Sequence, residues 1–104
     1  MEEMELVAFQ LISNVGEARS CLFEAMREAR EENFEEAEKL MKDAEEALLR
    51  GHESHSSLIM KEASGEKVEF SLLLMHAEDQ LMTTETLKGM ANEVILTHKK
   101  YSQK

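Results

Sequence analysis

Length, composition and charge narrow the class of protein at once. The chain has 104 residues, with 12 Lys and Arg against 22 Asp and Glu and a formal net charge of −10, which argues against nucleic acid and against an anionic membrane surface as partners. Pro is absent, aromatic residues make up 5%, and Glu, Leu, Lys, Met and Ala dominate, so we expect one all-α domain over residues 1–104.

Targeting and redox signals are few. The lone Cys21 excludes a disulfide framework and a Cys-based zinc site. The acidic N-terminus lacks the apolar run of a signal peptide. No segment approaches the roughly 20 apolar residues that span a bilayer. We therefore expect a cytoplasmic protein without direct membrane insertion.

The first predicted helix covers residues 3–31. Its apolar positions recur at spacings of three and four or their multiples, which indicates one helical face. These positions are Ala8, Ile12, Val15, Leu22, Met26 and Ala29. The small residues Gly16, Ala18 and Ser20 make the middle of this helix slim, so we expect a neighbouring helix to approach closely there.

The second predicted helix covers residues 34–62. The preceding Asn33, with Glu36 three residues later, has the pattern of a capping box. Its apolar seam alternates spacings of three and four, as in coiled coils. The seam consists of Phe34, Ala37, Met41, Ala44, Leu48, Gly51, His55 and Leu58.

The third predicted helix covers residues 71–100. Gly65 can adopt the left-handed conformation that ends the second helix, and Ser71 can cap the third. Because the connections are short, consecutive helices should be antiparallel. The sequence therefore predicts an up-down-up three-helix bundle.

The third helix has two apolar arcs when its residues are placed about 100° apart. One arc is sufficient for the bundle core and consists of Leu73, Leu74, Ala77, Leu81, Thr84, Ala91 and Ile95. The second arc lies nearly opposite and consists of Leu72, Met75, Met82, Thr83, Thr86 and Met90. Since one bundle needs one stripe from each helix, the second arc predicts association.

Asp79 lies in the middle of the second arc, and His76 lies at its edge, about 60° away. Asp79 is either a solvated residue or a carboxylate repeated across an oligomer, where it could hold a hard cation such as Mg²⁺. His76 could be a hydrogen-bonded core histidine, a metal ligand, a general base or a nucleophile that carries a group. Spacing alone does not choose among these roles.

The segment FSLLLMHAEDQLMTT, residues 70–84, resembles the phosphorylation-site segment of the lactose/cellobiose class of enzyme IIA proteins. These proteins belong to the bacterial sugar phosphotransferase system. The segment from Gly16 to Ser20, the second-helix His52 and the turn from Glu62 to Glu66 also resemble this family. The resemblance extends from about Leu6 to Lys99.

The resemblance implies a fold and a function. The fold is a homotrimer of three-helix subunits, in which one Asp79 from each subunit holds a cation such as Mg²⁺. The function is that of a phosphoryl carrier, a phosphotransferase component. Phosphorylated HPr, the histidine phosphocarrier, donates to Nε2 of His76, and a cysteine of the cognate IIB accepts the group for uptake of a disaccharide through the membrane IIC.

Two positions depart from the family pattern. Gln80 stands where many members have His, which puts in doubt any electrostatic contribution from this position. His55 stands where members often have Gln, and its place on the second seam indicates packing. A non-enzymatic oligomeric adaptor and a regulatory phosphoacceptor are alternative functions. The sequence does not specify the sugar.

Overall fold

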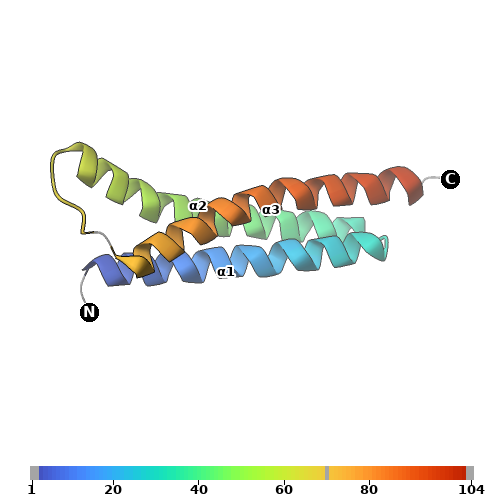
Figure 1. Cartoon of the computed structure of the whole chain (residues 1–104). Helices are drawn as coiled ribbons and strands as arrows, with labels where there is room; N and C mark the ends of the chain where they lie inside the picture. The colour runs from blue at the N-terminus through green and yellow to red at the C-terminus, as the bar shows by residue number, and fades with distance from the viewer. Residues whose placement is uncertain (1–2, 70, 103–104) are drawn as a thin grey trace.

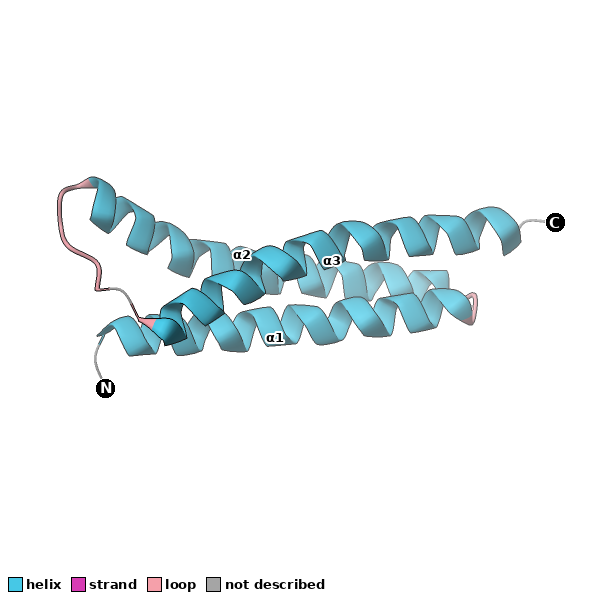
Figure 2. Cartoon of the chain, in the orientation of Figure 1, coloured by secondary structure: helices cyan, strands magenta, loops and turns pink. Residues whose placement is uncertain are grey.

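The protein is a bundle of three long helices (Figures 1 and 2). The computed structural model describes residues 3–69 and 71–102. Its helices are α1 (Glu3–Arg30), α2 (Phe34–Ala63) and α3 (Leu72–Ser102), in a molecule measuring 58 × 24 × 19 Å. Since α2 runs opposite to α1 and α3, the predicted up-down-up bundle is confirmed, with helix ends within two residues of those expected.

Each helix buries one strip, whose spacings are mostly three, four or seven, as in coiled-coil packing. The strip of α1 consists of Ala8, Leu11, Val15, Ala18, Leu22, Ala25 and Ala29. The buried residues of α2 are Ala37, Leu40, Ala44, Ala47, Leu48, Gly51 and Leu58. The strip of α3 consists of Leu74, Ala77, Leu81, Thr84, Ala91 and Ile95. The first predicted arc of α3 is thus confirmed except at Leu73, which is half-buried.

The buried strips of α1 and α2 differ in part from those predicted. Ile12 and Met26 flank the strip of α1 and are only half-buried. Phe34, Met41 and His55 likewise lie at the edge of the strip in α2. The adjacent residues Leu11, Ala25 and Leu40 are buried in place of Ile12, Met26 and Met41.

A close helix approach occurs at Gly51, whereas the approach predicted at Gly16, Ala18 and Ser20 holds only for Ala18, which is buried. Gly16 and Ser20 are exposed, and a Cβ at Gly16 would meet no atom within 4 Å. A Cβ at Gly51 would stand 3.3 Å from Cδ1 of Leu11 and 3.5 Å from Cδ1 of Leu81. Gly51 therefore marks the point where all three helices meet.

The two turns end their helices in the same way. In the first, Glu32 has a positive φ of 63°, and the N–H of Asn33 donates to the carbonyl of Glu28 at 2.9 Å. In the second, Gly65 has a φ of 94°, and the N–H of Glu66 donates to the carbonyl of Lys61 at 3.2 Å. Both are Schellman-type ends, and the left-handed role predicted for Gly65 is confirmed.

The two predicted N-caps had different outcomes. The Oγ of Ser71 accepts a hydrogen bond from the N–H of Leu74 at 3.0 Å, so the cap of α3 is confirmed. The capping box at Asn33 is wrong, because the Asn33 side chain makes no cap bond and its Nδ2 donates to Glu28 Oε2 at 2.8 Å. Asn33 is still the N-cap residue of α2, since its carbonyl accepts from the N–H of Ala37 at 3.0 Å, but its side chain bonds to the last turn of α1.

Glu32→Gly should stabilise the protein. A left-handed backbone conformation costs a residue with a side chain roughly 1–2 kcal/mol, and glycine avoids this cost. Part of the gain is offset, because glycine has more conformational entropy in the unfolded chain. We expect a net gain of about 0.5–1 kcal/mol, and a gain of 1 kcal/mol corresponds to a rise of about 4–8 °C in Tm for a domain of this size. Thermal and urea unfolding at a fixed protein concentration measure it. Glu31→Gly is the matched control, and an equal or larger gain there would contradict the assignment.

Candidate functional site

His76 and Asp79 lie in the second turn of α3, and both are exposed. Because they are three residues apart on one helix, their side chains are neighbours on its surface. In residues 3–69 and 71–102, no hydrogen bond or ion pair to either side chain occurs. The core-histidine role is therefore excluded for His76 within one chain, and its ring is accessible.

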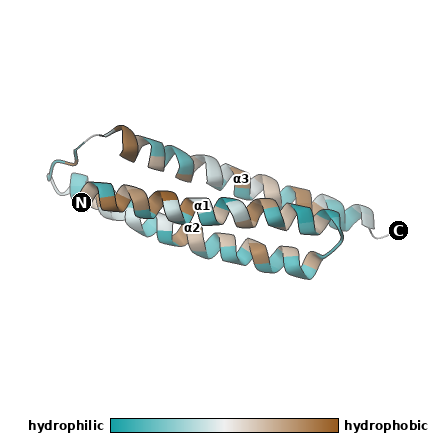
Figure 3. Cartoon of the chain, turned by 90° about the horizontal axis from the view of Figure 1, so that it is seen from below, coloured by the Kyte–Doolittle hydropathy of each residue, from teal (hydrophilic) through white to brown (hydrophobic). Residues whose placement is uncertain are grey.

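The second apolar arc of α3 is fully on the surface. Leu72 is 80% exposed, Met82 68% and Met90 59%, and Met75 is 47% exposed. The strongly hydrophobic start of α3 is visible in Figure 3. The prediction that this arc lies outside the core of the bundle is confirmed, and Asp79 is the carboxylate within it.

The start of α3 favours an anion close to His76. Its first turn has no acidic residue, and Ser71 caps only one of the free backbone N–H groups. Helical side chains lean toward the N-terminus, so His76 leans toward this positive end of the helix. A group with negative charge on the His76 ring would be stabilised there.

Among the described residues, four contacts between basic and acidic side chains join α2 to α3, and we call them the α2–α3 seam. Two are His–Glu pairs close to the start of α3, the near pairs: His52–Glu85 and His55–Glu78. Two are Glu–Lys pairs farther along, the far pairs: Glu45–Lys88 and Glu38–Lys99. α2 and α3 contact each other much less than either contacts α1, so these pairs are a large part of their attachment.

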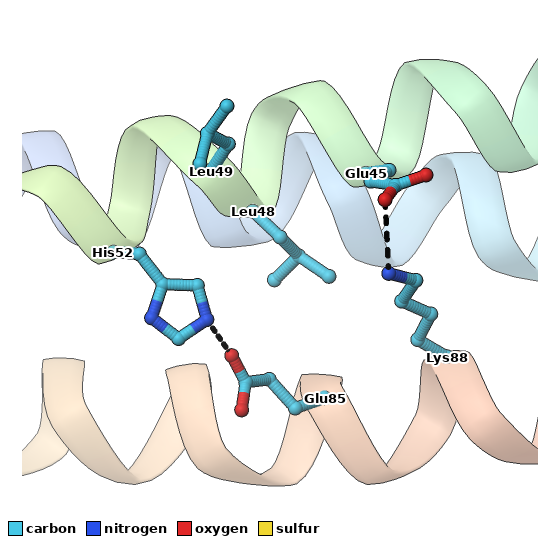
Figure 4. A pocket seen from close by; sticks show the side chains of 6 residues that line it. All are labelled: Glu45, Leu48, Leu49, His52, Glu85 and Lys88. Carbon is cyan, nitrogen blue, oxygen red and sulfur yellow. Dashed lines mark ion pairs between the residues drawn. The ribbon is translucent and has the colours of Figure 1, made fainter.

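A hollow between α2 and α3 is not the site of His76 (Figure 4). The His52–Glu85 pair and the Glu45–Lys88 pair, at 3.7 Å, flank Leu48 in it. The lining consists of Glu45, Leu48, Leu49, His52, Glu85 and Lys88. Sequence reasoning missed this seam, although Glu38, Glu45 and His52 recur every seven residues on α2.

The remaining nucleophiles are less suited to react. His55 is half-buried with its Nδ1 2.8 Å from Glu78 Oε1, so it contacts a carboxylate where packing was predicted. His98 is half-buried near the end of α3. Burial, with the carboxylate of Asp43 as the next cause, raises the pKa of the Cys21 thiol, which keeps it protonated.

The described part of a single chain forms no metal site around Asp79. Within the described residues, no group of three or more His, Cys, Asp or Glu side chains could hold a metal ion. Among those same residues, no helix is both long and apolar enough to cross a membrane. A metal at Asp79 would therefore require several copies of the chain.

Comparison with known proteins gives the class. Residues 6–99 match the model of the family described as "PTS system, Lactose/Cellobiose specific IIA subunit". The chain belongs to this family of phosphotransferase-system components, and His76 and Asp79 both fall within the matched residues.

Individual relatives cover nearly the whole chain. The lichenan-specific phosphotransferase enzyme IIA component of Bacillus subtilis is 43% identical over 98% of this chain and 93% of its own length. The crystal structure of the cellobiose-specific enzyme IIA from Bacillus anthracis matches with a TM-score of 0.97 at 43% identity, over 100% of this chain and 95% of that one. The IIA(chitobiose)–HPr complex of the Escherichia coli phosphotransferase system matches with a TM-score of 0.84 at 34% identity, over 98% and 99%.

Proposed function

We propose that this chain carries a phosphoryl group on His76 within a sugar phosphotransferase system. It receives the group from phosphorylated HPr and passes it to a cysteine of a cognate IIB, which works with a membrane IIC. The observation that carries the proposal is the position of His76, exposed and unpartnered in the described residues at the positive end of a helix. Membership of the family and its likeness to a IIA–HPr complex support the donor.

The chemistry requires little beyond an accessible imidazole. A neutral ring with its proton on Nδ1 has a lone pair on Nε2, which attacks phosphorus as the bond to the donor histidine breaks. One N–P bond thus replaces another, and the sulfur of IIB later replaces His76 in the same manner. Catalysis is mainly in-line positioning and charge neutralisation, to which the start of α3 contributes.

The sugar is a disaccharide of the lactose, cellobiose or chitobiose type in this proposal. The relatives are named for lichenan, cellobiose and chitobiose, so similarity of this degree does not separate them. A carrier of this kind needs no sugar pocket of its own, because sugar selection belongs to IIC.

The active assembly in this proposal is a homotrimer with Asp79 from each subunit around one axis. The exposed arc of α3 supplies the apolar surface that such an interface would bury. Carboxylates brought together there would repel each other, and a hard cation such as Mg²⁺ accepts carboxylate oxygens as ligands. Asp79 therefore fits the metal, which would neutralise charge and hold the subunits together.

His76→Ala should abolish phosphate acceptance from phosphorylated HPr and leave the helical fold intact, because His76 is exposed and outside the core. Radiolabel from phosphoenolpyruvate, supplied through enzyme I and HPr, measures the first effect, and circular dichroism measures the second. His98→Ala is the matched control and should accept the full amount of label.

Mass mapping of the labelled protein at mildly alkaline pH should place the phosphate on His76 and none on His55 or His98. Undiminished label on His76→Ala would end the assignment. A wild-type chain that takes no label would favour the helical adaptor instead, whereas label without transfer to any IIB would favour a regulatory phosphoacceptor.

Asp79→Leu should remain trimeric and lose its response to Mg²⁺. Replacing a charge in an interface by an apolar group of similar size is often neutral or stabilising, because it removes desolvation and repulsion. Wild type should melt at a lower temperature with chelator, since a cation at 100 times its Kd stabilises the assembly by about 2.7 kcal/mol. Sedimentation and thermal melts with and without chelator measure both effects.

Glu46→Leu is the control for this experiment, because it removes an exposed carboxylate of α2 and should leave the Mg²⁺ response unchanged. A wild-type monomer in both conditions would show that the apolar arc of α3 is not an interface between copies. A trimer that responds to neither Mg²⁺ nor chelator would support the proposed interface and contradict the proposed metal site.

A further inference from the structure

Exposed methionines gather on one face of the described chain. Four described methionines are exposed, and three of them, Met75, Met82 and Met90, lie on the second apolar arc of α3 at 47%, 68% and 59% exposure. We call these three the arc methionines. The fourth, Met60, is 71% exposed on α2. Three others are partly buried against the core, and these are Met4, Met26 and Met41.

The arc methionines have the spacing of a helix face in a coiled coil. Asp79 and Thr86 stand between them, so that Met75, Asp79, Met82, Thr86 and Met90 follow one another at intervals of three or four residues. A face with this spacing fits a second helix that has the same spacing, and α3 of a second copy of the chain is such a helix. Each copy has a net charge of −10, but Asp79 is the only ionisable residue of the arc. Two copies can therefore meet there with little repulsion between like charges.

Among its described side chains, the arc has no free hydrogen-bond donor. Its two hydroxyl groups donate to carbonyls of the same helix, Thr83 Oγ1 to that of Gln80 at 3.2 Å and Thr86 Oγ1 to that of Met82 at 3.5 Å. The ionised carboxylate of Asp79 only accepts hydrogen bonds. A polar acceptor introduced into this face would therefore lose its water on association and find no donor in return.

Oxidation of a methionine introduces such an acceptor. The sulfur lone pair attacks one oxygen of hydrogen peroxide, and an S–O bond forms as the O–O bond breaks. The departing hydroxide takes the proton from the transferred oxygen and leaves as water, so that sulfur loses the two electrons that the peroxide gains. The product, methionine sulfoxide, is polar where the thioether was apolar. Met75 and Met82 are helix neighbours of Asp79, four residues before it and three after it, so their sulfoxide oxygens would lie beside a carboxylate that cannot donate to them.

We infer that oxidation of the arc methionines by a peroxide prevents α3 from pairing with α3 of a second copy of the chain. The unpaired chain is the form that reacts, because pairing would cover the sulfur atoms. The modification is reversible, since methionine sulfoxide reductases restore the thioether. The inference rests on the interface between copies in the proposed function, and it adds a covalent control of assembly that leaves His76 unmodified.

The test combines hydrogen peroxide with sedimentation. Each protein is oxidised at low concentration, peptide mapping measures the sulfoxide at every methionine, and sedimentation over a range of concentrations then gives the midpoint of association. The triple variant Met75→Leu, Met82→Leu and Met90→Leu removes the sulfur atoms of the arc and nearly conserves their volume. Met60→Leu is the matched control, because it removes an exposed sulfur outside the arc. The reference chain and both variants also carry Cys21→Ala, so that no change can come from the thiol.

Oxidation should raise the midpoint concentration of the reference chain by at least about tenfold, because the buried sulfoxide oxygens lack donors. Met60→Leu should respond in the same way. The triple variant should associate like the reference chain before oxidation and keep its midpoint afterwards. Incubation with the two methionine sulfoxide reductases, one for each sulfoxide epimer, should return the oxidised reference chain to its original midpoint. Circular dichroism should show unchanged helicity throughout, because the arc methionines lie outside the core.

The opposing outcomes are distinct. Sulfoxide on all three arc methionines with an unchanged midpoint would overturn the inference and leave the interface in place. An equal rise of the midpoint in the triple variant would also overturn it, because sulfur atoms outside the arc would then be responsible. A reference chain that stays monomeric before oxidation would instead overturn the proposed interface, and with it this inference. Transfer of phosphate to His76 is measured separately, so the relay is judged independently of the assembly.

Discussion

The side chains of Leu11 and Leu81 both lie close to Gly51, where no Cβ separates the helices. This close packing of the three helices determines which surfaces are left exposed. The core is built largely of Ala and Leu, which lets the helices approach closely. Each helix buries one strip, and its other faces remain at the surface. The outer half of α3 is therefore unused by the fold. Because packing within the bundle places no demand on that surface, it can hold a reactive histidine and a carboxylate at little cost in stability.

The sides of α3 differ in what they contact. It contacts α1 extensively, whereas its contact with α2 is sparse and includes the His–Glu and Glu–Lys pairs. Figure 1 shows α2 and α3 diverging toward the connection between them. Ion pairs at partly exposed positions contribute little stability individually, so this contact is easier to adjust than the apolar one. The turn that carries His76 thus lies near the end of the bundle where α2 and α3 diverge.

Much of this could be predicted from the sequence, because helical periodicity, Gly65 and Ser71 each have a local physical cause. The second apolar arc of α3 could be predicted for the same reason, because the spacing of residues along the sequence determines which of them share a face of a helix. Contacts between helices could not, because they depend on the relative rotation and offset of two helices. The pairing of His55 with Glu78 is of this kind. Asn33 was misassigned because one side chain could serve the helix before it or the helix after it.

His76 stands on a convex helix surface, which has a kinetic consequence for the proposed relay through this histidine. Donor and acceptor proteins must each cover the same few side chains to bring their own reacting atom to Nε2. They cannot be bound to that histidine together, so the exchange is a double displacement in which one partner departs before the other arrives. Tight binding by either partner would slow the flow of phosphate. Throughput is therefore highest when both complexes are short-lived, and an excess of unphosphorylated HPr acts as a competitor.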